Sequence, residues 1–325
     1  MRYHSFLAFA RTMVALVFTG STAVFGQAYP TKPIRLIAPY PPGGGVDATA
    51  RTVAAALSAA FGQQVVVENR GGASGRIGTE IAAQAPADGY HLLLGSVGPN
   101  AIIPAAYSKL PYDAVKDFAP VSLVADADYI LTVHPSLPVR SVLQLIALAR
   151  ARPGQIVFAS TGNLGGPHLA GELFKQLAKV NMVHVAYKGG GPATTSILSG
   201  ETSLIFGSAP TVVPHAKAGR LRLIATTGVS RSKILPELPT VAEMLPGHEV
   251  TQWYGILVPA GTPAEIISRL NAEIVKTLAT PKVVQQLERL GTEARSTTPA
   301  EFAAHIKAEI AKWGKVVKSS GIKVE

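Results

Sequence analysis

The sequence predicts an α/β protein with two lobes. Short β-leaning runs alternate with helical runs along the chain, and a glycine-rich loop follows most of the strands. This alternation is typical of α/β layers with largely parallel sheets. The two strongest strand–loop–helix units begin at Ile34 and at Gln155, far enough apart to be equivalent units of separate lobes. A length of 325 residues fits two domains.

The elements follow in order along the chain. The first part is expected to contain a strand at 34–40, a loop at 41–45, a helix at 47–61, a strand at 65–68, a glycine loop at 71–75, a helix at 77–83, a strand at 90–94 and a loop at 95–99. The second is expected to contain a strand at 155–159, a loop at 160–167, a helix at 169–177, a strand at 183–187, glycines at 189–191 and a helix through 198. Helices at 264–278, 282–290 and 299–318 complete the chain, each with a proline near its start, where a missing N–H costs least.

Composition predicts where the chain crosses between lobes. Boundaries near 126–128 and 226–228 give a first lobe of residues 29–125 and 228–325, and a second lobe of residues 126–227. Two crossings make a hinge. Right-handed crossovers place the glycine loops at the carboxyl edges of the sheets, where ligands of such folds bind. A ligand cleft is therefore expected between facing loops.

Residues 1–28 have the three-part layout of a cleavable signal peptide. Arg2 and Arg11 form a basic start, residues 13–25 are apolar, and the small residues Gly26 and Ala28 precede a cut before Tyr29. The apolar run is shorter than the roughly 20 residues that span a bilayer. We therefore expect export and a soluble mature protein.

Composition excludes several function classes. The net charge of +10 comes from scattered Lys and Arg, and aromatic residues make up only 6%, which argues against a nucleic-acid stacking surface. Without cysteine there is no disulfide and no thiolate nucleophile. The sequence has no Gly-x-Ser-x-Gly elbow and no Walker pattern, and its eight histidines form no zinc motif. We predict no catalytic residue, no metal and no cofactor.

The glycine loops are the candidate site. A loop that leads into a helix N-terminus presents free N–H groups and binds anions without a charged side chain. One loop from each lobe could grip one carboxylate. Asp47 could cap the first helix or contact the ligand directly. Gly43 to Ala48 also fits a dinucleotide fingerprint with Glu68 as its acid, but export and the stiff Pro41–Pro42 turn disfavour that interpretation.

Two further polar side chains lie next to these loops. His168 opens the helix after the second-lobe loop and could bond the ligand, although a structural hydrogen bond to the loop is favoured. Lys188 follows a strand and could pair with an anion or remain solvated.

Motifs along essentially the whole mature chain resemble those of the Bug-type periplasmic solute receptors of tripartite tricarboxylate transporters. They are 29–35 (YPTKPIR), 39–47 (PYPPGGGVD), 67–70 (VENR), 88–90 (DGY), 110–113 (LPYD), 116–118 (KDF), 168–174 (HLAGELF), 187–189 (YKG), 238–243 (LPTVAE) and 253–255 (WYG).

This resemblance implies a periplasmic-binding-protein-like (Venus flytrap) fold and a periplasmic, non-catalytic, monomeric receptor. It implies capture of a small organic carboxylate, a di- or tricarboxylate or an aromatic acid, and docking to a large and a small membrane subunit. The ligand-binding residues it implies are Tyr40, Gly43, Gly44, Asp47, Ser96 in the loop after Leu94, Thr161, Gly162 and His168.

Two departures from the family pattern refine the ligand class. Phe206 is followed by Gly207–Ser208 where members commonly carry Asp, and Gly165–Gly166–Pro167 stands where hydroxyl residues are frequent. Both favour a simple or aromatic carboxylate over an amino acid. The alternatives left open are an exported α/β enzyme and a sensory receptor without a transporter.

Overall fold

The computed structural model describes residues 29–320, and the predicted signal peptide lies outside them. The strands are β1 (Ile34–Ala38), β2 (Val65–Asn69), β3 (His91–Ser96), β4 (Phe118–Val133), β5 (Val157–Ser160), β6 (Val183–Ala186), β7 (Leu204–Ser208), β8 (Arg222–Thr226), β9 (Thr251–Pro259) and β10 (Thr292–Ala294). The helices are α1 (Gly45–Phe61), η1 (Ala73–Gly75), α2 (Arg76–Ala83), η2 (Gly98–Ile102), α3 (Ile103–Ala106), α4 (Val142–Ala151), α5 (Gly166–Ala178), α6 (Gly190–Leu198), α7 (Ala209–Lys217), α8 (Val241–Met244), α9 (Ala264–Leu278), α10 (Pro281–Arg289) and α11 (Pro299–Ser320).

The predicted α/β fold with two lobes is confirmed. One continuous sheet runs in the order β2-β1-β3-β9-β4-β7-β5-β6, with β8 and β10 attached to β4. The outer strands of each lobe are parallel, as the alternation predicts, whereas β4 and β9 pair antiparallel to their neighbours. The parallel strands carry the loops that lead into α1, α5 and α6.

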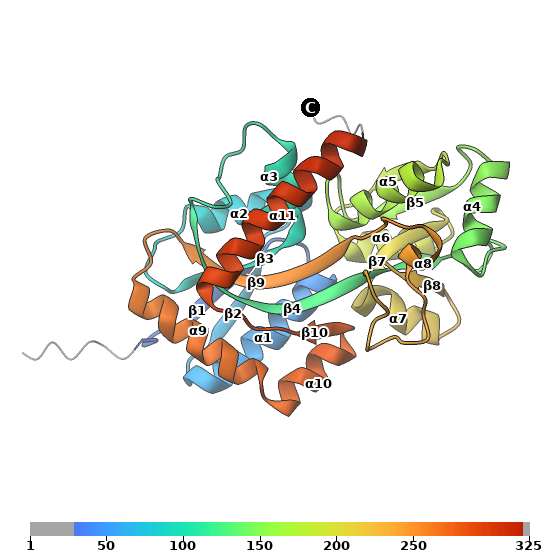
Figure 1. Cartoon of the computed structure of the whole chain (residues 1–325). Coiled ribbons are helices and arrows are strands. Elements are labelled where there is room, and N and C mark those ends of the chain that lie inside the picture. The colour runs from blue at the N-terminus through green and yellow to red at the C-terminus, as the bar shows by residue number, and fades with distance from the viewer. Residues whose placement is uncertain (1–28, 321–325) are drawn as a thin grey trace, which may run out of the picture.

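Two long strands join the lobes. β4 pairs with β9 through Asp128, and from Tyr129 onward it pairs with β7 and β8 instead. Figure 1 shows β4 and β9 running side by side from one lobe towards the other. We therefore propose that the chain changes lobe within β4, between Asp128 and Tyr129.

We propose that the second crossing lies in β9. After β8, Thr226 still bridges Thr240, and the Val250 N–H donates to the Thr227 carbonyl. Leu238 packs into the apolar cluster beneath α6 and α7. These contacts attach residues 229–250 to the second lobe. We therefore propose that the second lobe extends to about residue 250 rather than 227, because pairing with the first lobe resumes only at Thr251.

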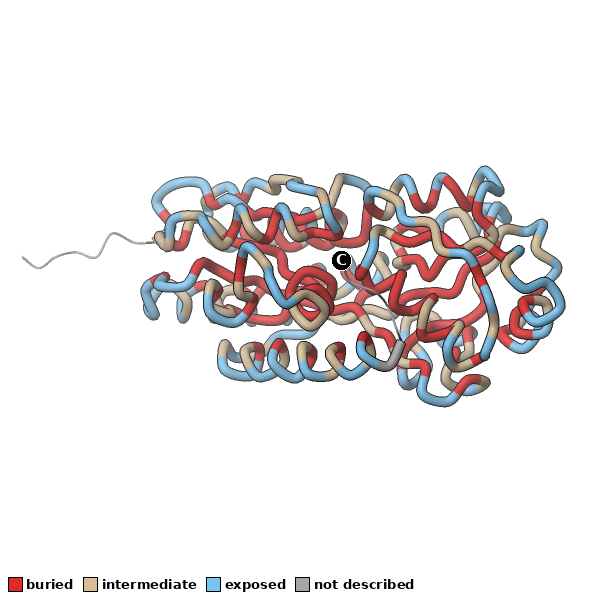
Figure 2. The backbone as a smooth tube through the Cα atoms, turned by 90° about the horizontal axis from the view of Figure 1, so that it is seen from above, coloured by how far each residue is buried: buried red, intermediate tan, exposed pale blue. Residues whose placement is uncertain are grey.

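Apolar side chains fill both faces of the sheet. One cluster lies between the first-lobe strands and helices α1, α9 and α10, and a second packs around α6 and α7. A third cluster continues through both lobes and includes Trp253, Phe302 and Trp313. Figure 2 shows the buried backbone as a band through the middle of both lobes. Among the helices of residues 29–320, none has both the length and the hydropathy to cross a bilayer.

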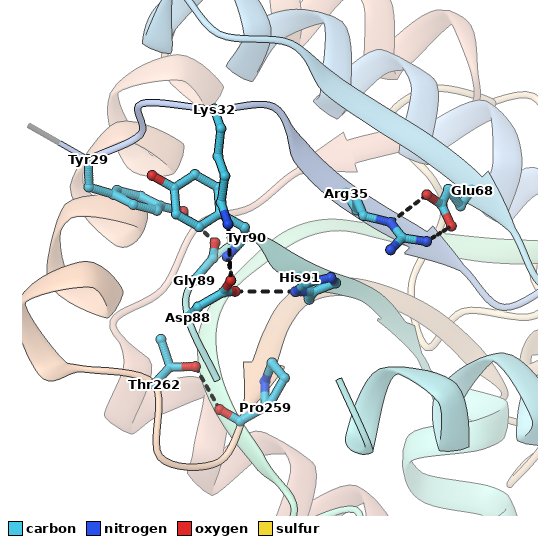
Figure 3. Close-up of polar contacts among 10 residues, drawn as sticks. All are labelled: Tyr29, Lys32, Arg35, Glu68, Asp88, Gly89, Tyr90, His91, Pro259 and Thr262. Carbon is cyan, nitrogen blue, oxygen red and sulfur yellow. Dashed lines mark hydrogen bonds and ion pairs between the residues drawn. The ribbon is translucent and has the colours of Figure 1, made fainter. Parts of the chain in front are cut away.

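The start of the described chain is fixed to the first lobe. The Tyr29 hydroxyl donates to the Gly89 carbonyl at 2.6 Å, and Lys32 pairs with Asp88, which also contacts His91 (Figure 3). The first residues after the predicted cut therefore hold the turn that leads into β3.

Candidate functional site

A cavity lies between the lobes, where several helices begin. It leaves about 40 Å³ for the centres of water molecules. Its lining residues are Tyr40, Gly44, Gly45, Val46, Gly98, Tyr129, Thr161, Gly166, Pro167, Gly190, Ile205, Gly207, Ser208, Thr211, Gln252 and Tyr254. None of these lining residues, all within the described chain, is an Asp, Glu, Lys, Arg or His. The lining therefore presents only neutral polar groups and apolar surface.

The first turn of α1 forms one wall. Gly44 is its N-cap in extended conformation and makes no side-chain cap hydrogen bond. The first bond within the helix runs from the Ala48 N–H to the Gly44 carbonyl. The N–H groups of Gly45, Val46 and Asp47 therefore have no partner within the helix, and two of these residues line the cavity.

Asp47 shapes this wall from behind. Its carboxylate accepts hydrogen bonds from the Gly43 N–H and from Asn69 Nδ2, each at 3.0 Å, and pairs with Arg51 at 3.0 Å. Burial raises its pKa, but the hydrogen bonds from Arg51, Gly43 and Asn69 outweigh burial and lower the pKa below its usual value. Asp47 is absent from the cavity lining, so its carboxylate folds the loop that presents Gly44 and Gly45.

Three more helices begin at the cavity. Gly166 and Pro167 open α5, Gly190 opens α6, and Ser208 is the N-cap of α7. None of these helices has a side-chain cap hydrogen bond, so the positive ends of four helix dipoles converge on one space.

Buried hydroxyls complete the lining. Tyr129 and Gln252, from the two crossing strands, share a hydrogen bond of 3.1 Å. Tyr254 lies on β9, and its hydroxyl and the Ser208 hydroxyl both stand where a side chain on Gly45 would project. Burial raises the pKa of Tyr129 well above its usual value and that of Tyr254 to about 12. These phenols therefore stay protonated at neutral pH and remain able to donate a hydrogen bond.

His168 supports the second-lobe loop. Its Nδ1 accepts from the Leu164 N–H at 3.1 Å, which leaves the proton of the neutral ring on Nε2. The ring stacks on His184 with centroids 4.0 Å apart, and His184 Nε2 lies 2.7 Å from the Ser160 hydroxyl. Burial lowers the pKa of His168 to about 3 and that of His184 to about 4. Both rings are therefore neutral at physiological pH.

The lobes touch across the cleft. The Ser74 hydroxyl of the first lobe donates to the Asn163 carbonyl of the second at 2.6 Å. Gly162 allows this approach, because a Cβ there would collide with Ser74 Oγ. The Tyr40 hydroxyl donates to the Ser74 carbonyl at 2.8 Å and so holds the first-lobe side of the contact. The two lobes are thus in direct contact at Ser74 and Asn163.

A larger vestibule lies outside the cavity. It leaves about 830 Å³ by the same measure, and the two spaces share Tyr40 and Thr161, one from each lobe. The vestibule is also lined by residues 71–77 and 186–189, with Arg76 and Lys188 among them. Tyr40 and Thr161 therefore lie where the two spaces adjoin.

The predicted site residues fall into three groups. Tyr40, Gly44 and Thr161 line the inner cavity, Gly162 lines the vestibule, and Gly43, Asp47, Ser96 and His168 line neither space. Ser96 was expected in a loop, and that expectation is wrong: it is the last residue of β3, paired with Tyr254. Its hydroxyl is buried without a hydrogen-bond partner in the described part of the chain. The roles of all eight in ligand binding stay predictions.

Sequence reasoning missed most of the polar lining. Tyr129, Gln252 and Tyr254 lie on crossing strands that were not predicted, and Ser208 and Thr211 begin an unpredicted helix. Two hints of this lining were present in the sequence: the 253–255 motif, and Gly207–Ser208 where the resembled family commonly carries Asp. Neither hint by itself places a side chain in a cleft.

The chain matches the model of the tripartite tricarboxylate transporter family receptor over residues 49–322. It is similar to protein BugT of Bordetella pertussis, with 37% identity over 93% of each chain. Its structure is similar to that of Rpa4515 of R. palustris with adipate, at a TM-score of 0.88 and 37% identity, covering 90% of this chain and 99% of that one. It is also similar to MatC of Rhodopseudomonas palustris with bound malate, at a TM-score of 0.83 and 27% identity, covering 89% and 100%.

Proposed function

The chain belongs to the tripartite tricarboxylate transporter receptor family, and we propose that it captures a small organic carboxylate between its lobes in the periplasm. The family is one of solute-binding receptors and not of enzymes. On our proposal this chain likewise binds its ligand without changing it chemically.

The convergence of four uncapped helix N-termini on a cavity without charged side chains is the observation that carries this proposal. Partial positive charge from backbone dipoles favours an anion there. An amino group would lack a carboxylate partner in this lining, which supports a simple carboxylate over an amino acid. The ligands named for two relatives, adipate and malate, are of the same chemical class.

The mechanism follows from the two lobes. In an open state, the α1 wall binds one side of the carboxylate. Closure then brings the starts of α5 and α6, on the other lobe, to the opposite side, while β4 and β9 act as the hinge. A ligand that contacts both lobes stabilises the closed state by its difference in affinity for the two states.

We place the mature protein, residues 29–325, in the periplasm after cleavage before Tyr29. The packing of Tyr29 against Gly89, Phe61 and Tyr90 supports this, because residue 29 is already part of the folded first lobe. On the same proposal the closed receptor docks as a monomer to a large and a small membrane subunit of a tripartite transporter.

Calorimetry and thermal-shift measurements on residues 29–325 test the proposal. Organic acids should raise the melting temperature by linkage to binding, and the matching primary amides should not, because they carry no charge. Mass spectrometry should recover the acid unchanged. If no carboxylate binds, or if the bound acid is converted, the receptor assignment is wrong.

A further inference from the structure

A separate pocket lies beside the two strands that join the lobes. It leaves about 310 Å³ for the centres of water molecules, and its lining includes Asp128 of β4, Gly228 after β8 and Glu293 of β10. No residue of the described chain lines both this pocket and either of the spaces between the lobes. We call it the hinge pocket, because it surrounds the point in β4 where we propose that the chain changes lobe.

The side chain of Asp128 lies across this point. Asp128 is the last residue of β4 that pairs with β9, and the next residue, Tyr129, pairs with β7. The Tyr129 N–H donates to the Thr227 hydroxyl at 3.0 Å, which ties Thr227 to the second-lobe side. Gly228 follows Thr227 and packs directly on the Asp128 carboxylate, since a Cβ there would lie 2.5 and 2.6 Å from its two oxygens. A hinge motion at this point therefore moves Gly228 relative to the carboxylate.

The Asp128 carboxylate has no counter-ion. In the described chain it forms no ion pair and no hydrogen bond, and the cations near it are already paired with other acids: Arg295 with Asp126 at 2.6 Å, Arg231 with Glu243 at 2.8 Å, and Lys233 with Glu293 at 3.3 Å. Burial lowers the pKa of His305, which lines the pocket from α11, so this ring is neutral at neutral pH. From β9 the pocket receives only Thr251 and Trp253, which carry no charge.

Burial without a counter-ion makes the charged form of Asp128 costly. Burial first, and then the nearby carboxylates of Glu293 and Asp126, raise the pKa of Asp128 to about 6. The group therefore changes charge close to neutral pH. In this structure the lobes touch at Ser74 and Asn163 while Gly228 covers the carboxylate. Ionisation of Asp128 thus weakens the arrangement in which the lobes touch.

We propose that Asp128 is a proton-sensitive element of the hinge: its ionised form favours separation of the lobes, and its protonated form favours their contact. The physical cause is hydration, because movement of Gly228 away from an ionised carboxylate without a counter-ion admits water to it. Ligand capture between the lobes then strengthens as the pH falls from about 8 to about 5.5, since the coupling of proton and ligand is reciprocal. This inference rests on the proposed function, because it assumes that the ligand contacts both lobes.

Titration calorimetry with adipate between pH 8 and pH 5.5 tests the coupling in the wild type and in Asp128→Asn. The amide keeps the shape of the side chain but does not ionise. Protonation of adipate affects both proteins equally, so the ratio of their Kd values isolates Asp128. If the pKa of Asp128 differs by about one unit between the two arrangements, the wild type should bind about tenfold more weakly than the variant at pH 8 and about threefold more weakly at pH 5.5.

Energy transfer between dyes on the two lobes tests the hinge without a ligand. The chain has no cysteine, so Ala147→Cys on α4 and Ala272→Cys on α9, both exposed, place one dye on each lobe. The transfer efficiency of the otherwise wild-type protein should change between pH 8 and pH 5.5. With Asp128→Asn added, it should stay constant, at the value that the protein without this change approaches at low pH.

The matched control is Glu288→Gln, which removes an exposed carboxylate from α10 at a position that lines none of these spaces. Its Kd should equal that of the wild type at every pH. A purely structural role of Asp128 would raise the melting temperature of Asp128→Asn but leave the Kd ratio the same at every pH, and that result would overturn the proposal.

The outcomes also separate this inference from the receptor function. Transfer efficiency that does not depend on pH in the protein that retains Asp128 would overturn the proton-sensitive hinge and leave carboxylate capture intact. Failure of every acid to bind the wild type would overturn the receptor function, and the dye measurement would still decide the role of Asp128.

Discussion

Substitution of Gly45 by alanine tests the inner cavity most directly. A Cβ on Gly45 would lie 2.9 Å from both the Ser208 hydroxyl and the Tyr254 hydroxyl. Ordinary C···O contacts are about 3.3–3.6 Å, so both oxygens must retreat by about 0.5 Å. The added methyl group also projects into the cavity, which Gly45, Ser208 and Tyr254 line.

The magnitude follows from the donors that are displaced. A hydrogen bond to a charged group contributes about 1.5–3 kcal/mol, so loss of two such bonds to a carboxylate costs about 3–6 kcal/mol. At about 1.4 kcal/mol for each factor of ten, the Kd should rise about 100-fold or more. The strain of overpacking should lower the free energy of unfolding by about 1–3 kcal/mol.

Calorimetry with an organic acid that binds the wild type measures the loss, and circular dichroism checks the fold. Gly314→Ala is the matched control, because nothing lies within 4 Å of a Cβ at that position in α11. Its affinity should equal that of the wild type. A folded Gly45→Ala protein whose Kd lies within twofold of the wild-type value would show that the carboxylate does not bind at the start of α1.

Three further substitutions test the residues around the cavity. Asp47→Ala removes the acceptor of three hydrogen bonds. Chemical denaturation should show that the free energy of unfolding falls by about 1–3 kcal/mol, and calorimetry that the free energy of binding weakens by about 1 kcal/mol. Wild-type values for both would mean that this carboxylate does not shape the loop. The pKa of His168 is about 3 in the folded protein and about 6.5 in the unfolded chain, so the unfolded chain binds more protons between these pH values. The stability of the protein should therefore fall as the pH drops from about 6.5 to about 3. A series of thermal melts over this pH range should show a shallower fall for His168→Gln. Tyr129→Phe removes the hydroxyl that donates to Gln252 and should lower the free energy of unfolding by about 1 kcal/mol, measured by chemical denaturation. An unchanged denaturation midpoint would contradict the hydrogen bond between Tyr129 and Gln252.

Local patterns in the sequence predict much of this fold. The helix of 264–278 is found at the predicted bounds, and α1 and α2 begin within two residues of the predicted starts. Alternation of strands and helices depends on short-range periodicity and turn chemistry, which a single sequence displays.

The crossing strands were not predicted, for a physical reason. β4 is a 16-residue strand with partners in both lobes, and β9 returns far along the chain to pair with it. Antiparallel pairing at this separation leaves no local signal, because the partners are selected by the packing of the whole sheet. The expected return at residue 228 precedes the return we propose, near Thr251, for the same reason.

The sequence by itself predicted the type of site that we propose. Glycine loops at helix starts indicate backbone donors for an anion, since that property depends on chain geometry and needs no partner from elsewhere. Gly44 lines the cavity as this reasoning expects.

Only the tertiary structure decided which side chains surround the cavity between the lobes. It places Tyr129, Gln252 and Tyr254 in the cavity, moves the Asp47 carboxylate behind the loop, and brings Arg76 and Lys188 to one vestibule. These placements depend on how two lobes close on each other, and contacts between residues so distant in the chain are set by packing and not by local sequence.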